Sequence, residues 1–193
     1  MNEPTNEAVA WHQLGYAFQR AKRWDEAESA YRESARLRES MGDISGAADS
    51  YQNLAVVMEN AGKPGEAEAW YIRAMEGFRQ TGERGGQSVV ASNLAGLLLD
   101  QNDRARLDEA RKLAEEALAI RKTLDPGAAS IWKTYNILAE IADKGEDAGR
   151  AREYRRLARE ARDQFPGTAH LVARILTQFK PVIELVAAAC GGD

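Results

Sequence analysis

The chain has 193 residues, of which 44% are hydrophobic and 29% charged, a balance that excludes a disordered chain and suits one helix-rich domain or a short repeat array. Its formal net charge of −4 gives no electrostatic reason to expect a nucleic acid or an anionic membrane as the main partner. The single cysteine, Cys190, excludes an internal disulfide framework. The N-terminal segment lacks the pattern of a signal peptide, and apolar runs such as Leu94–Leu99 are too short to cross a bilayer. We therefore expect a soluble, cytoplasmic protein.

A leucine followed by a small residue recurs along the chain. The spacings between these pairs are 40, 40 and 44 residues, at Leu14-Gly15, Leu54-Ala55, Leu94-Ala95 and Leu138-Ala139. An alanine follows the first, second and fourth leucine by thirteen residues and the third by sixteen, at Ala27, Ala67, Ala151 and Ala110. An aromatic or apolar residue stands three positions before each leucine, at Trp11, Tyr51, Ala91 and Tyr135. Small side chains at fixed positions let two helices approach closely, and large ones fill the space opposite.

Within each unit the apolar residues recur at three and four positions, which is the helical period, on both sides of a turn signal. This pattern predicts helix–turn–helix repeats at about residues 6–40, 43–81, 84–123 and 128–164. The loop of the third unit, NDRARLDE, carries about three extra residues. One hairpin of helices cannot bury its own apolar face, so we expect the four units to stack and share a core.

The segment 168–193 predicts a ninth helix, from about Thr168 to Ala189, kinked or split at Pro181. One interpretation is a helix that caps the last repeat. The segment stays apolar, however, where a cap should present a polar outer face. The second interpretation is therefore that the chain is a fragment of a longer protein, in which a further helix follows.

The repeat pattern resembles the tetratricopeptide repeat (TPR) family. The first unit carries nearly the whole signature, and the second keeps much of it; the matching residues are Trp11, Leu14, Gly15, Phe18, Ala27 and Tyr31, then Leu54, Ala67, Tyr71 and Ala74. Units three and four are weaker, with Ala91 where an aromatic is usual and Arg155 at a usually apolar position. The period of about 40 residues is similar to that of kinesin light chain repeats. The resemblance implies an all-α, right-handed solenoid whose first helices line a concave groove.

No catalytic constellation stands out in the sequence. His12 and His170 lie in different parts of the chain, Cys190 has no histidine near it in sequence, and the spacings typical of metal ligands are absent. The Gly-rich segment 82–88 lacks the phosphate-binding pattern, and we expect it to separate two helices. The arginines between 150 and 162 alternate with acids, which favours a solvated helix face, with a docking patch for an acidic partner as the alternative. We expect neither an enzyme nor a bound cofactor or metal.

The first helix of each unit supplies the predicted site. One row of side chains stands directly before each leucine, at Gln13, Asn53, Asn93 and Ile137, and a second row lies two before it and includes His12, Gln52 and Asn136. A third row, two after the leucine, includes Tyr16, Gly96 and Glu140. Carboxamides both donate and accept hydrogen bonds, so a ladder of them can pair with the backbone of an extended peptide. The resemblance implies such contacts for Asn53 and Asn93. The alternative is that the ladder bonds neighbouring repeats and fixes their spacing.

These observations predict a noncatalytic scaffold that binds a peptide or protein segment in its concave groove. Two alternatives remain open: a sensory or regulatory domain of a larger bacterial signalling protein, and a module that forms homo-oligomers, such as a dimer through the C-terminal helix. We expect a protein or peptide as the partner, and neither nucleic acid nor membrane.

Overall fold

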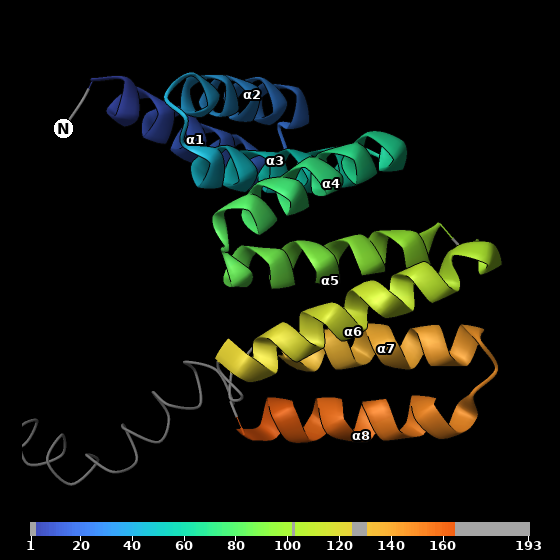
Figure 1. The fold of residues 1–193 in the computed structure, drawn as a ribbon. Helices are drawn as coiled ribbons and strands as arrows, with labels where there is room; N and C mark the ends of the chain where they lie inside the picture. The colour runs from blue at the N-terminus through green and yellow to red at the C-terminus, as the bar shows by residue number, and fades with distance from the viewer. Residues whose placement is uncertain (1–2, 102, 125–130, 165–193) are drawn as a thin grey trace, which may run out of the picture.

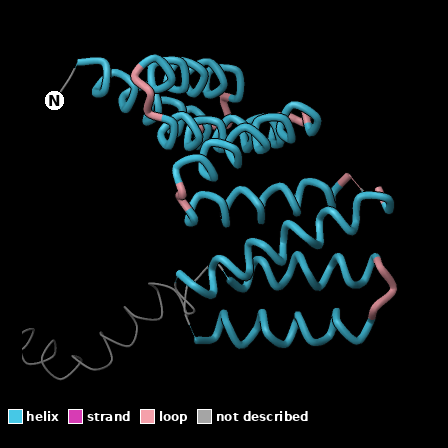
Figure 2. Tube along the Cα trace, in the orientation of Figure 1, coloured by secondary structure: helices cyan, strands magenta, loops and turns pink. Residues whose placement is uncertain are grey.

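The computed structural model describes residues 3–101, 103–124 and 131–164, and every regular element within these ranges is a helix. Figure 1 shows the helices as consecutive antiparallel pairs stacked along one direction, and Figure 2 shows the short loops that join them. The elements are α1 (Glu3–Arg20), α2 (Trp24–Ser40), α3 (Ile44–Asn60), α4 (Pro64–Thr81), α5 (Arg84–Asp100), a 3₁₀ turn η1 (Arg104–Arg106), α6 (Leu107–Leu124), α7 (Ile131–Lys144) and α8 (Ala148–Gln164). The predicted all-α solenoid is confirmed. The predicted ninth helix, with its kink at Pro181, lies outside the described residues.

We call the first helix of each pair an A helix (α1, α3, α5 and α7) and the second a B helix (α2, α4, α6 and α8). Each A helix packs most extensively against the B helix of its own pair, and each B helix packs next against the A helix that follows it. The 3₁₀ turn η1 lies between α5 and α6 and occupies the three extra residues that the sequence indicated for the third unit. The insertion therefore lengthens a connection and leaves the helix pair intact.

Short turns with a left-handed residue follow α1, α2, α3, α4 and α7. Gly42, Gly62 and Gly82 have φ values of 71°, 75° and 73°, and two residues with side chains, Lys22 and Glu146, adopt φ values of 58° and 62° at equivalent turns. The Gly82 turn separates α4 from α5, as expected for the Gly-rich segment. Because the turns recur about every 20 residues in the first two units, two helices and two turns make up the period of about 40 residues.

The core is built from small residues that face large ones. The four repeat alanines, Ala27, Ala67, Ala110 and Ala151, have no exposed surface. Tyr31 and Tyr71, four residues further on, are also fully buried. A Cβ added to Gly15 would lie 2.9 Å from the ring of Tyr31, so this glycine is required for α1 and α2 to pack at this distance. The residue pattern that defined the repeat is thus the pattern of its closest contacts.

The repeat leucines show how position in the stack controls burial. Leu54, Leu94 and Leu138 are buried, whereas 40% of Leu14 is exposed. The internal helices α3 and α5 pack against helices on both sides, but α1 packs only against α2 and α3 within the described residues. The first leucine keeps the family pattern without a complete set of neighbours.

Replacing Ala67 by arginine should destabilise the array. The substitution forces a long charged side chain into a fully buried helix contact, so we expect the free energy of unfolding to fall by about 3 kcal/mol or more. Urea denaturation followed by circular dichroism measures this loss. Ala69→Arg is the matched control, since Ala69 lies exposed on the same helix. Equal stability of the two variants would show that the register of the second repeat is wrong.

The turn residues provide a second stability test. Gly62→Lys places a side chain in the left-handed conformation and should lower the free energy of unfolding by about 1–2 kcal/mol. Lys22→Gly removes the same strain from the equivalent turn of the first pair and should leave stability unchanged or raise it. Thermal melting of both variants checks the signs, and a loss in Lys22→Gly equal to that in Gly62→Lys contradicts the explanation.

Candidate functional site

The A helices form the inner side of the stack. Successive A helices contact one another directly, whereas no two successive B helices come as close within the described residues. In a curved stack the spacing is smallest on the inner side, so α1, α3, α5 and α7 line the concave face and the B helices line the convex face. The predicted site residues all belong to these A helices.

Three of the predicted site residues already have partners within the protein. The Nε2 atom of His12 lies 3.3 Å from Nδ2 of Asn53, and its Nδ1 atom lies 3.4 Å from Oγ of Ser50. Asn53 also donates to the backbone oxygen of Asp49 at 3.1 Å. Because the amide nitrogen of Asn53 can only donate, Nε2 of His12 must accept and its Nδ1–H must donate to Ser50. These bonds tie α1 to α3.

The His12 bonds continue into a buried hydroxyl network. Oγ of Ser50 lies 3.1 Å from Oγ of Ser34, which donates to the backbone oxygen of Ala8 at 2.9 Å. The His12 ring also meets the edge of the Tyr31 ring, with 5.2 Å between centroids. Burial of the imidazole, and secondly the positive charge of Arg38, hold the pKa of His12 below its ordinary value. The neutral ring is thus part of the junction between the first two repeats.

Asn93 is engaged in the second repeat junction. It lies close enough to the Tyr71 hydroxyl to influence its pKa, and this hydroxyl donates to a carboxylate oxygen of Glu59 at 2.9 Å. Burial is the main cause that raises the pKa of Tyr71 far above its usual range, with the Glu59 charge second. Contacts at Asn53 and Asn93 therefore support the alternative that the amide ladder holds neighbouring repeats in place. Peptide binding by these two residues stays a prediction.

A recurring contact joins the two helices of a repeat between residues twelve positions apart. Tyr31 donates to Gln19 at 2.9 Å in the first repeat, and Tyr71 donates to Glu59 in the second. In the fourth repeat Arg155 pairs with Asp143. Arg155, at a position that is usually apolar, is thus explained by the acid opposite it. The same contacts use carboxylates of the concave side internally, which reduces the charge left for a ligand.

The other five predicted residues are open to a ligand. Gln13, Tyr16 and Glu140 are exposed, with 56% of the Tyr16 surface accessible, and Gln52 and Asn136 are half-buried. Within the described part of the chain, the structure gives none of the five a hydrogen bond or an ion pair. Gly96, of the third predicted row, has only Ile137 near the place where a side chain would stand, with an added Cβ 3.9 Å from Cδ1. The five free polar residues are thus spread over α1, α3 and α7, and α5 contributes Gly96 between them.

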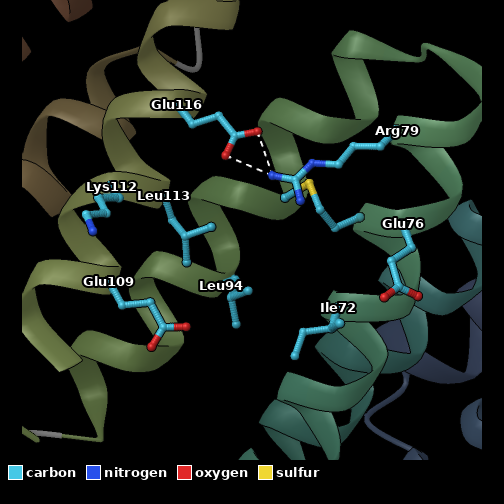
Figure 3. Close-up of a pocket in the computed structure, with 9 residues that line it drawn as sticks. Ile72, Glu76, Arg79, Leu94, Glu109, Lys112, Leu113 and Glu116 are labelled. Atoms are coloured by element: carbon cyan, nitrogen blue, oxygen red, sulfur yellow. Dashed lines mark hydrogen bonds and ion pairs between the residues drawn. The ribbon is translucent and has the colours of Figure 1, made fainter.

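A cavity on the convex side was not found from the sequence. It has a volume of about 310 Å³ and lies between α4 and α6, with Leu94 of α5 among its lining residues. Figure 3 shows Ile72 and Glu76 on one wall and Lys112 and Leu113 on the other. Arg79 spans it by donating to both carboxylate oxygens of Glu116, at 2.9 and 3.1 Å. The only indication of this cavity in the sequence is Ala91, which stands where the repeat usually has an aromatic residue.

Two kinds of feature are absent from the described residues. No three histidine, cysteine, aspartate or glutamate side chains gather there in a way that could hold a metal ion. In the same ranges, no helix combines the length and the apolar character needed to span a membrane.

Comparison with known proteins decides the family. The tetratricopeptide repeat model matches residues 6–80 and 46–123, which together make up more than half of the chain. The chain belongs to the tetratricopeptide repeat family. TPR domains are generally protein-interaction modules and typically noncatalytic. Among curated proteins, no sequence matches the chain significantly.

Solved structures confirm the TPR fold. BtubC (BKLC) from P. vanneervenii superposes with a TM-score of 0.76 at 24% identity, covering 86% of this chain and 67% of its own. PilF of Pseudomonas aeruginosa gives a TM-score of 0.66 at 19% identity, covering 100% of this chain and 79% of its own. At these identities the likeness shows the fold alone. The resemblance to kinesin-light-chain-like repeats is confirmed by the family match and by the superposition on BtubC (BKLC).

His12 should make stability depend on pH. Its pKa is lower in the folded state than the ordinary value of about 6.5, so the unfolded chain binds the proton more readily. Stability should therefore fall as the pH drops from 7 through 6.5 towards the lowered pKa, and level off below it. Urea denaturation at pH 7, 6 and 5 measures the loss, and His12→Gln should lack this component. Parallel stability curves for the two proteins would rule out the neutral His12 junction.

Proposed function

We propose that this TPR protein is a noncatalytic scaffold that binds an extended segment of a protein partner along its concave face. The supporting observation is the row of free side chains on the A helices, from Gln13 and Tyr16 on α1 through Gln52 on α3 to Asn136 and Glu140 on α7. These residues can bond a ligand without breaking a contact of the fold.

Affinity in this proposal comes from preorganisation. The helices hold donors and acceptors in place before the partner arrives, so binding orders few protein groups. Gln52 and Asn136 each offer both a donor and an acceptor to a peptide backbone, and the exposed Tyr16 ring can stack on an apolar side chain. Asn53 contributes through its amide oxygen, since its nitrogen is engaged with His12 and Asp49. Hydrogen bonds to the backbone of the partner provide affinity, and contacts with Tyr16 and Glu140 provide selectivity for its side chains.

A pull-down from the lysate of the source organism tests the proposal. The variant Gln13→Ala/Tyr16→Ala/Gln52→Ala removes free groups only, so it should fold normally and retain a partner about tenfold less or weaker still, as expected for loss of an aromatic anchor with two polar neighbours. Quantitative mass spectrometry of the retained proteins provides the measurement. Equal retention by this variant and the wild type would exclude the concave face.

Two control variants separate binding from architecture. Glu66→Ala/Glu115→Ala changes exposed residues of the B helices α4 and α6 and should retain the partner fully. Asn53→Ala/Asn93→Ala removes groups that are bonded within the protein, so its melting temperature has to be measured beside its retention. A folded Asn53→Ala/Asn93→Ala variant that loses the partner supports the amide ladder, and one that melts early assigns the ladder to the fold.

A further inference from the structure

Two of the grooves between successive B helices on the convex side contain an aromatic pair, and the α2–α4 groove also holds a cavity of about 290 Å³ beside Tyr51 and Arg73. Between α2 and α4, the rings of Tyr51 and Trp70 stack with 5.4 Å between centroids and 24° between planes. Arg73 covers both rings, with its guanidinium carbon 4.5 Å from the Tyr51 centroid and 5.1 Å from that of Trp70. Between α6 and α8, Tyr135 and Tyr154 lie 6.3 Å apart.

The aromatic pairs occupy equivalent positions in the repeat. Tyr51 and Tyr135 each stand three residues before the repeat leucine, and Trp70 and Tyr154 each stand three residues after the repeat alanine. In the middle groove, between α4 and α6, these two positions hold Ala91 and Leu113. The large rings of the outer grooves are therefore missing there, and the 310 Å³ cavity, which Leu113 lines and Ala91 does not, lies in this groove.

The frame of the middle groove matches that of its neighbour. In the α2–α4 groove, Glu39 pairs with Arg73 at 3.2 Å. The equivalent positions in the α4–α6 groove hold Arg79 and Glu116, which pair at 2.9 Å with the charges exchanged. The same crossing ion pair spans both grooves. The cavity of the α2–α4 groove lies beside Tyr51 and Gly77, whereas that of the α4–α6 groove lies beside Ile72 and Leu113, where the preceding groove has its rings.

The rim of the cavity carries charged groups that the fold does not use. Glu76 on α4 and Lys112 on α6 are exposed, and neither has an ion-pair partner among the described residues. Figure 3 shows them on opposite walls, on either side of Ile72 and Leu113. As much as 45% of the Ile72 surface is accessible, which is high for an aliphatic side chain beside a cavity.

We propose that the α4–α6 groove is a second docking site, which takes an aromatic side chain of a protein partner with a basic residue next to it. The ring fills the space that Tyr51 and Trp70 fill in the preceding groove, against Ile72, Met75 and Leu113. The basic residue pairs with Glu76. This site is on the opposite side of the array from the concave face, so both can be occupied at once.

Peptide probes test this site directly. Acetyl-Lys-Trp-Lys-amide is titrated into the protein, and the methyl signals of Ile72, Met75 and Leu94 are followed by NMR. We expect saturable shifts at these methyl groups. Acetyl-Lys-Ala-Lys-amide should give none, because it lacks the ring. Acetyl-Glu-Trp-Glu-amide should bind about two- to fivefold more weakly, as expected for loss of one exposed ion pair.

Two variants make the test decisive. Leu113→Trp restores the residue type of the preceding groove and should fill the cavity, abolish the shifts and keep the melting temperature. Glu76→Lys leaves the apolar walls intact and should reverse the preference, so that the Glu-Trp-Glu probe binds better than the Lys-Trp-Lys probe. Unchanged shifts in a folded Leu113→Trp protein, or shifts confined to other methyl groups, would overturn the proposal. If Leu113→Trp misfolds, the charge reversal in Glu76→Lys decides alone.

Self-association is measured in parallel by light scattering. A dimer of the wild type that Leu113→Trp disrupts would mean that a second copy of this chain fills the groove, and would also overturn the proposal for a separate partner.

Discussion

Four fully buried alanines, one in each B helix, set the distance at which the two helices of every repeat pack. Steric contact at these positions is the constraint on which the other levels of the structure depend. Gly15 shows how little room there is, since even one methyl group would meet the ring of Tyr31. A closely packed pair of helices still has an apolar face that it cannot bury by itself. The next pair covers this face, and the repeats therefore stack.

Once the pairs stack, the two sides of the array acquire different roles. A helices contact one another along the concave side, where contacts such as those of His12 with Asn53 and Ser50 hold neighbouring repeats in register. B helices are further apart on the convex side, so the grooves between them need large side chains to fill them. Aromatic pairs pack in two of the grooves, whereas the third has Ala91 and Leu113 at the equivalent positions and a cavity beside Leu113. A change of two residues within a repeat thus removes two rings from a groove on the convex side.

Sequence periodicity predicted the fold well because the same residue types make its tightest contacts. Ala27, Ala67, Ala110 and Ala151 are conspicuous in the sequence since no larger residue fits where they pack. The turn at Gly82 and the extra residues before α6 were also predictable, because both depend on local backbone chemistry.

The candidate site was less accessible from sequence because side-chain partners depend on neighbouring repeats. Asn53 and Gln13 occupy the same repeat position, yet Asn53 has His12 of the preceding repeat beside it and Gln13 is exposed without such a neighbour. Arg155 was a departure from the family pattern until Asp143 was found opposite it. The cavity could not be predicted from one repeat, because each groove between B helices is lined by residues of two repeats. The sequence register of the repeats identifies equivalent positions. Only the packing of two repeats against each other shows which side chains at these positions lack a partner within the protein.

Site-specific photo-crosslinking from the concave face tests the central claim most directly. A photoreactive phenylalanine analogue is introduced at Tyr16, where the side chain is exposed, and at Ala69 on α4 as the convex control, and each protein is irradiated in the cell lysate. The account predicts a discrete crosslinked protein from position 16 that is absent from position 69. Crosslinks from position 69 alone, or the same crosslinks from both positions, would contradict a partner on the concave face.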